Sequence, residues 1–252
     1  MLELYNAAHS TCSQKVRMCM HEKGLSWKEH LLDLGRKEQL DPQYLELNPN
    51  GVVPTLVHDG AVITDSSVIC EYIEEVFPHP HLSPDTPVAR AKMRAWMRYL
   101  EEVPTVAVRV PSFNMAFLPR FEGQDDDTFL KTEAGPRPLR KYFFSKMGRG
   151  GFDVQEINDS FEQIRQTVER MADAVKTSGG PWLMGPSITL IDIIVAPLID
   201  RMNDLGHSNL WSDLEPVVSW YRLIQRRTSF QKTFYKNARI SEFLCLSPLI
   251  TE

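Results

Sequence analysis

The sequence predicts an α+β protein of two parts, in which strands and helices alternate in the first part and only helices follow. Three observations carry this prediction. The length of 252 residues suits two hydrophobic cores better than one. Strand-like and helix-like patterns alternate over residues 1–80, in the order β-α-β-(α)-β-β-α. No clear strand pattern follows, so residues 88–252 form an all-helical C-terminal domain, with a linker at 81–87.

Alternation of apolar and polar residues or a strong turn signal defines each predicted strand of the first domain. Asp59-Gly60 is a hairpin turn signal between two short apolar runs. Apolar side chains at helical spacing, closed by Gly24, define the first helix. The predicted strands are 2–5, 27–34, 54–58 and 61–63, and the predicted helices are 12–23, 37–47 and 67–77.

The second domain begins after a proline-rich segment that cannot continue a helix, with three prolines in residues 79–87. Residues 104–151 are irregular, and we expect one or two broken helices and a long loop there. Loops of that length in compact domains often form lids or substrate walls. The predicted regular helices are 88–103, 161–177, 190–205 and 217–226.

Composition argues against several functions. The net charge is −5 and no cluster of lysine and arginine stands out, so we expect no nucleic-acid partner. No apolar run approaches the ~20 residues of a bilayer span, and no secretion signal is visible. The four cysteines lack metal-ligand spacing, so we expect no metal site, reduced thiols and a cytoplasmic protein.

The most informative local feature is the turn that joins the first strand to the first helix. It reads Ser10-Thr11-Cys12-Ser13 and is preceded by His9, which we expect to face solvent. A helix N-terminus presents free backbone N–H groups and a positive dipole end. The turn can therefore hold an anion such as a thiolate, with Ser10, Cys12 and Ser13 as candidate catalytic residues.

The segment from Ser10 to Arg17 resembles the Ser-x-Cys-Ser-x-Arg-Val-Arg turn of zeta-class glutathione transferases and of related bacterial reductive dehalogenases. With three further motifs, it makes the chain similar to the glutathione transferase superfamily. The resemblance implies a thioredoxin-like N-terminal domain and glutathione as cosubstrate. It also implies that Ser10 activates the glutathione thiol, and that Cys12 is a candidate for redox chemistry.

The second motif runs from Asn48 to Pro54 and is similar to the family's Asn-Pro-x-x-x-Val-Pro segment, whose proline is cis. A cis bond before Pro54 would turn the backbone of Val53 outward, to pair with the cysteinyl unit of glutathione. The family often has a lysine where this chain has Val52, so the contact to the glycyl carboxylate must come from elsewhere. Gln39 matches a polar family position, and Lys37 is a looser candidate.

The third motif, Asp65-Ser66, is like the family's Glu/Gln-Ser pair at the start of a helix. Ser66 can bind the γ-glutamyl carboxylate and Asp65 the α-ammonium group. The fourth motif pairs Thr189 with Asp192 in a capping box, which starts the core helix of the second domain and has no catalytic role.

The motifs predict glutathione binding, and they leave several reactions to consider. We expect the thiolate to attack a small hydrophobic, aromatic electrophile that binds in an apolar pocket of the helical domain, and we expect a homodimer by family analogy. Residues 140–152 resemble a region of bacterial β-etherases, which implies β-aryl ether cleavage. One alternative is a glutathione-dependent redox enzyme or reductive dehalogenase that uses Cys12. Another is a non-catalytic binding protein, which Val52 slightly favours. Candidates for the pocket wall are Tyr99, Asn114, Phe117, Tyr142 and Phe143.

Overall fold

The computed structural model describes residues 1–242. Its sheet has four strands in the order β2-β1-β3-β4, with β1 parallel to β2 and antiparallel to β3. This mixed sheet and the helical second domain confirm the α+β prediction and the thioredoxin-like architecture. The strands are β1 (Leu2–Asn6), β2 (Lys28–Leu31), β3 (Thr55–His58) and β4 (Ala61–Thr64).

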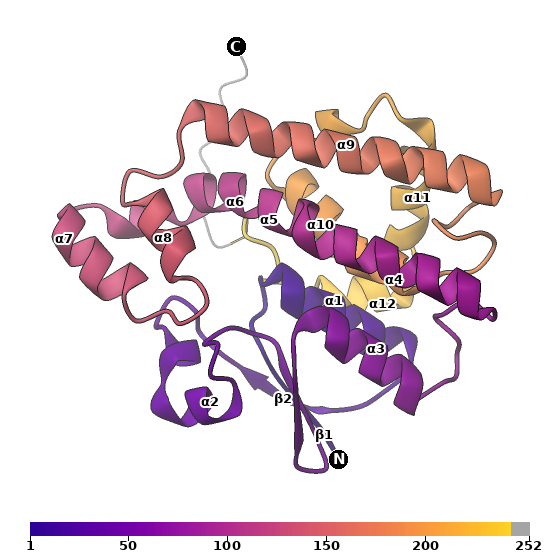
Figure 1. The fold of residues 1–252 in the computed structure, drawn as a ribbon, viewed down its shortest axis with the longest axis horizontal. Coiled ribbons are helices and arrows are strands. Elements are labelled where there is room, and N and C mark those ends of the chain that lie inside the picture. The colour runs from indigo at the N-terminus through magenta and orange to yellow at the C-terminus, as the bar shows by residue number, and fades with distance from the viewer. Residues whose placement is uncertain (243–252) are drawn as a thin grey trace.

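Two helices of the first domain lie between its sheet and the helical domain (Figure 1). These are α1 (Thr11–Glu22) and α3 (Ser66–Val76), which pack against each other through buried apolar side chains. The short helix α2 (Pro42–Leu47) and the 3₁₀ turn η1 (Glu38–Leu40) lie at the left of the sheet in the same view. The N-terminus of α1 therefore faces the second domain.

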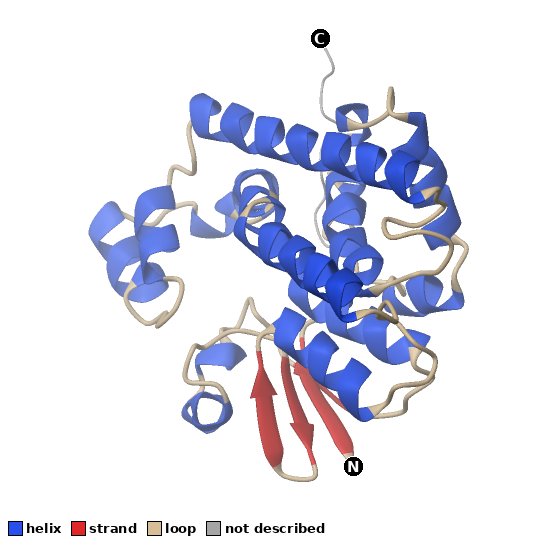
Figure 2. Cartoon of the chain, turned by 45° about the vertical axis from the view of Figure 1, so that its right-hand side comes forward, coloured by secondary structure: helices blue, strands red, loops and turns tan. Residues whose placement is uncertain are grey.

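The second domain stacks long helices above the sheet (Figure 2). Its centre is α10, which is buried from Leu190 through Met202 because apolar residues occupy nearly every face of the helix. The main helices are α4 (Pro87–Glu102), α9 (Val154–Ser178), α10 (Leu190–Asp204), α11 (Glu215–Gln225) and α12 (Thr228–Thr233).

Buried polar contacts fix α1 against the second domain. The Lys15 ammonium lies 2.6 Å from a carboxylate oxygen of Glu101 and 3.0 Å from the hydroxyl of Thr105. Ser67, in the first turn of α3, donates to the same Glu101 oxygen at 2.5 Å. Burial alone would raise the pKa of Glu101, but Lys15 and the hydrogen bonds outweigh it and hold that pKa below its usual value. The carboxylate thus links both helices to α4.

The irregular segment differs from its prediction. Instead of one or two broken helices and a long loop, residues 104–147 form six short helical elements. The elements after α5 pack around a separate apolar core of Phe121, Phe129, Ala134, Phe144, Met147 and Phe152. Each element is too short to show a helical period in the sequence. The elements are α5 (Pro104–Ala107), α6 (Arg109–Ala116), η2 (Leu118–Phe121), α7 (Asp126–Phe129), the π turn η3 (Leu130–Ala134) and α8 (Lys141–Met147).

The segment from η3 to the start of α8 contacts the first domain. Lys37 forms an ion pair with Glu133 at 2.6 Å and donates to the carbonyl of Thr132 at 3.0 Å. Pro138 approaches Gly51 so closely that an added Cβ would lie 3.2 Å from the proline ring, and Gly51 also has a positive φ of 60°. This contact brings Arg137 and Arg140 over the first domain.

Candidate active site

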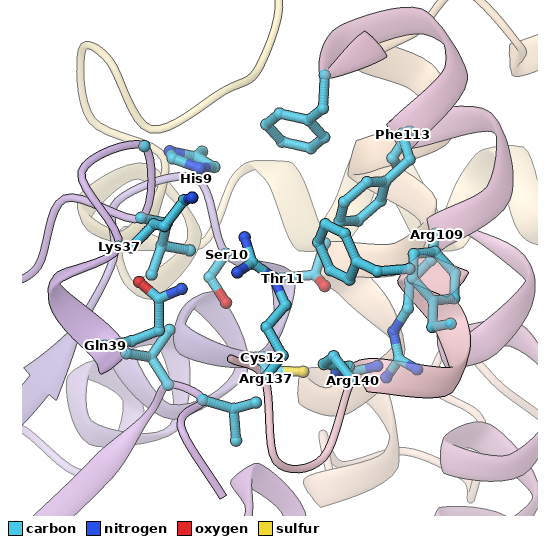
Figure 3. A pocket seen from close by; sticks show the side chains of 18 of the residues that line it. His9, Ser10, Thr11, Cys12, Lys37, Gln39, Arg109, Phe113, Arg137 and Arg140 are labelled. Atoms are coloured by element: carbon cyan, nitrogen blue, oxygen red, sulfur yellow. The ribbon is translucent and has the colours of Figure 1, made fainter. Parts of the chain in front are cut away.

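A cavity of about 290 Å³ lies between the two domains, at the N-terminus of α1 (Figure 3). The first domain contributes the turn at residues 9–12, the segment around Lys37 and Gln39, and the loop at 51–53. The second domain contributes α6, η2, the segment from η3 through α8, and one residue of α10. The second-domain lining is Val108, Arg109, Ser112, Phe113, Phe117, Arg120, Phe121, Glu133, Arg137, Arg140, Phe143, Phe144 and Arg201.

Ser10 lines the cavity and caps α1. Its hydroxyl oxygen accepts from the backbone N–H of Ser13 at 3.3 Å. A serine hydroxyl keeps one proton to donate while its oxygen accepts, so capping and thiolate stabilisation are compatible. The buried guanidinium of Arg17 holds the turn in place by donating at 2.6 Å to the Asn6 side chain and to the carbonyl of Ala8.

The other two candidates in the turn take different positions. Cys12, a free thiol, lines the cavity beside Ser10. Ser13 is fully buried and lies outside the cavity, where its hydroxyl accepts from the N–H of Ala7 at 3.2 Å. Because this oxygen is committed to the fold, the structure gives Ser13 a supporting position behind the turn.

Val53 lines the cavity, and the Val53–Pro54 peptide bond is cis. Tyr44 and Asn48 hold the preceding carbonyl, that of Val52, at 2.6 and 3.0 Å. Within residues 1–242, no hydrogen bond is made to the N–H or C=O of Val53. Both groups remain available for strand-like pairing, while Pro54 is buried behind them.

Two buried polar atoms on the same side lack partners. The Gln39 side-chain oxygen and one Nη of Arg137 are buried without a hydrogen bond, although both residues line the cavity. Burial lowers the pKa of Arg137, which Glu133 counteracts. Unpartnered groups of this kind cost free energy unless a ligand supplies the missing bonds. Lys37 and the other Nη of Arg137 already pair with Glu133.

Asp65 and Ser66 lie at the start of α3, outside this cavity's lining. Asp65 has a φ of 71°, and one carboxylate oxygen accepts from the N–H groups of Ser67 and Val68 at 3.0 and 3.1 Å. The side chain of Asp65 is exposed, whereas Ser66 is buried in the first turn. Asp65 and Ser66 therefore form a polar site of their own at the N-terminus of α3.

Two of the five residues predicted for the pocket wall line the cavity. Phe117 and Phe143 line the cavity, but Tyr142 is 80% exposed. Tyr99 shares a hydrogen bond with Thr167, and Asn114 clamps the backbone of Phe152 with bonds of 2.7 and 2.8 Å. These two side chains are structural.

Sequence reasoning missed most of the charged lining. His9 was expected in solvent but lines the cavity, where burial, and next the charges of Arg201 and Arg120, lower its pKa to about 4. His9 is therefore neutral at pH 7. Arg109, the nearby pair Arg137 and Arg140, and Arg201 come from three distant parts of the sequence, and only the fold brings them together. No sequence spacing could have signalled this cluster.

A thioredoxin-like sheet, a serine at the N-terminus of the first helix and a second, helical domain define a two-domain protein of the thioredoxin-like class. Comparisons with known proteins agree. The family model for the glutathione S-transferase N-terminal domain matches residues 9–76, and the model for the C-terminal domain matches residues 154–223. Together they match more than half of the chain, which belongs to the glutathione transferase superfamily, whose cosubstrate is glutathione.

Curated relatives and a solved structure support this membership. Protein LigF from Sphingobium sp. strain SYK-6 is 27% identical, over 94% of this chain and 95% of its own. The crystal structure of β-etherase LigF superposes with a TM-score of 0.82, covering 92% of this chain and 98% of the other at 26% identity. A glutathione S-transferase from Dianthus caryophyllus is 28% identical over 79% and 76% of the two chains. A stringent starvation protein A homolog from Pasteurella multocida is 26% identical over 92% and 90%.

Among the described residues, no group of three or more histidine, cysteine, aspartate or glutamate side chains is placed to hold a metal ion. No helix within residues 1–242 has the length and apolarity needed to cross a membrane.

Proposed function

We propose that this protein transfers glutathione to a hydrophobic aromatic electrophile, with Ser10 stabilising the glutathione thiolate. The position of Ser10 carries the proposal: its hydroxyl caps α1 on the wall of an interdomain cavity that also contains the unpaired main chain of Val53. Glutathione binds with its cysteinyl unit along Val53 and its sulfur beside Ser10. The γ-glutamyl group binds at Asp65 and Ser66, and the glycyl carboxylate at Gln39 and Arg137.

A hydrogen bond from Ser10 and the N-terminus of α1 are together sufficient to lower the pKa of the glutathione thiol. A free thiol has a pKa near ~8.5, and lowering it by ~2 takes ~2.7 kcal/mol of preferential stabilisation of the anion. A hydrogen bond to a charged group contributes ~1.5–3 kcal/mol, and a helix N-terminus adds ~0.3–1 kcal/mol. The thiolate then attacks an electrophilic carbon. In β-aryl ether cleavage, which the likeness to LigF supports, a C–S bond forms, the C–O bond breaks and the phenolate leaves with a proton from water.

Arg137 replaces the lysine that the family often has at the position of Val52. Arg137→Met should therefore raise the KM for glutathione by about tenfold or more, because a charge-assisted bond to the glycyl carboxylate is lost. Steady-state kinetics at varied glutathione concentration measure this effect. Arg149→Met is the matched control, because Arg149 is exposed and pairs with Asp126 outside the cavity. An unchanged KM in Arg137→Met would refute this assignment.

The position of Cys12 on the cavity wall favours a second candidate function, which is glutathione-dependent redox chemistry or reductive dehalogenation. The transferase proposal predicts that Cys12→Ser keeps conjugation activity within about threefold, since the substitution retains size and polarity near Ser10. Conjugation and glutathione-disulfide assays on the same preparation separate the functions. Loss of all activity in Cys12→Ser, with Ser10→Ala fully active, would favour the redox enzyme instead.

A non-catalytic binding role is the remaining alternative, since one fold hosts unrelated functions and one relative bears the name of a stringent starvation protein. Retention on immobilised glutathione and a thermal shift at millimolar glutathione decide this point. The absence of both would favour the binding role. We further propose a cytoplasmic homodimer with a glutathione-binding domain at residues 1–80, a linker at 81–87 and an electrophile-binding helical domain from residue 88.

A further inference from the structure

The cavity is strongly cationic although the chain as a whole carries a net charge of −5. Among the described residues that line it, six bear a positive charge and a single one, Glu133, bears a negative charge. The cations are Lys37, Arg109, Arg120, Arg137, Arg140 and Arg201. Such a concentration of charge favours anionic ligands.

Four of the six cations already have a partner. Lys37 and Arg137 share Glu133. Arg201 donates to the hydroxyl of Ser112 and to the carbonyl of His9. The guanidinium of Arg120 lies over the ring of Phe117, 5.0 Å from its centroid.

Arg109 and Arg140 differ from these four. In the part of the chain that the structure describes, neither guanidinium group has a hydrogen bond or an ion pair. The two charges are close enough to repel each other: burial, and next Arg109, lower the pKa of Arg140 to about 10. The group stays protonated at neutral pH. The nearby carboxylate of Glu101 is committed to Lys15 and Ser67.

The surroundings of this pair are aromatic. Arg109 and Phe113 lie one helical turn apart on α6, so they share a face of that helix. Phe143 and Phe144 follow Arg140 on α8, and all five residues line the cavity. Figure 3 shows Arg109 and Arg140 at one end of the cavity, near Cys12. An apolar wall with two unpaired guanidinium groups matches an aromatic ring that carries an anion.

We propose that the electrophile is an aromatic compound with a carboxylate, which Arg109 and Arg140 bind while the phenylalanines hold its ring. This inference rests on the proposed transferase function and names its substrate class. The two carboxylates of glutathione have other sites in that proposal, at Ser66 and at Arg137. Arg109 on α6 and Arg140, directly before α8, are thus available to the second substrate.

Isothermal calorimetry with three conjugates tests the proposal without relying on turnover. The probes are S-benzylglutathione, S-(4-carboxybenzyl)glutathione and the uncharged S-(4-carbamoylbenzyl)glutathione. The carboxyl conjugate should bind at least about tenfold tighter than the carbamoyl conjugate. Arg140→Met and Arg109→Met should each remove most of that preference, with S-benzylglutathione affinity kept within about threefold. Arg222→Met, which removes an exposed charge on α11, should keep the full preference.

The outcomes separate this inference from the function on which it rests. Equal affinity for the carboxyl and carbamoyl conjugates would overturn the inference alone. So would arginine variants that weaken all three conjugates equally, since the pair would then serve glutathione or the fold. Failure of every conjugate to bind the unmodified protein would overturn the transferase proposal, and the inference with it.

Discussion

Ser10→Ala should lower the rate of glutathione conjugation at neutral pH by about 10–100-fold. The hydroxyl that lines the cavity can donate to the thiolate, and a hydrogen bond to a charged group is worth ~1.5–3 kcal/mol. The loss should fall on kcat/KM and shrink at high pH, because glutathione then ionises without help. The acid limb of the pH–rate profile should therefore move to higher pH in the variant.

Capping must be separated from this effect, because Ser10 also accepts from the N–H of Ser13. Thr86→Ala is the matched control: Thr86 caps α4 by accepting from the N–H of Ala89 at 3.2 Å and lies outside the cavity. Each variant should lose about 1 kcal/mol of stability, but activity should fall only in Ser10→Ala. A Ser10→Ala variant with unchanged kinetics and an unchanged pH profile would rule out thiolate stabilisation by this hydroxyl.

Asp192→Ala should have the largest effect on stability, about 3–4 kcal/mol. The buried carboxylate accepts from the backbone N–H groups of Leu183 and Thr189 and from the indole of Trp220, at 2.9–3.0 Å. Leaving a buried donor unpaired costs ~1–3 kcal/mol. Burial raises the pKa of Asp192, so removing the carboxylate recovers some desolvation free energy and keeps the net loss at this value. Urea unfolding followed by circular dichroism measures the change.

Asp153→Ala is the comparison for Asp192→Ala. Asp153 caps α9 in a capping box with Glu156, and its partners are exposed. Its loss should cost about 1 kcal/mol, typical of a cap alone. Equal effects of the two substitutions would mean that the buried partners of Asp192 contribute little, and that its role is limited to starting α10.

Local signals explain what could be predicted from the sequence. The hairpin at Asp59-Gly60, the turn at Ser10 and the capping residue Asp192 depend on short segments, whose geometry their own residues determine. The positions of Ser10, Cys12, Gln39 and Val53 on one cavity followed from motifs attached to those elements. Their chemical roles stay predictions until they are measured.

The second-domain side of the cavity could not be predicted in the same way. Arg109, Arg140 and Arg201 meet only because α6, α8 and α10 fold together. Short helices and loops supply Arg137 and Arg140, and no hydrophobic period identifies such elements in the sequence. The burial of Ser13 could not be predicted from the sequence either. Whether a residue in the first helical turn faces the ligand or the core depends on how the helix packs.

The most direct test of the central claim is to titrate the thiol of bound glutathione by the ultraviolet absorbance of its thiolate. In the unmodified protein the pKa should lie about two pH units below the free value of ~8.5. It should return most of the way toward that value in Ser10→Ala and stay depressed in Cys12→Ser. Bound glutathione that titrates like the free tripeptide, or a depression lost only in Cys12→Ser, would contradict the role assigned to Ser10.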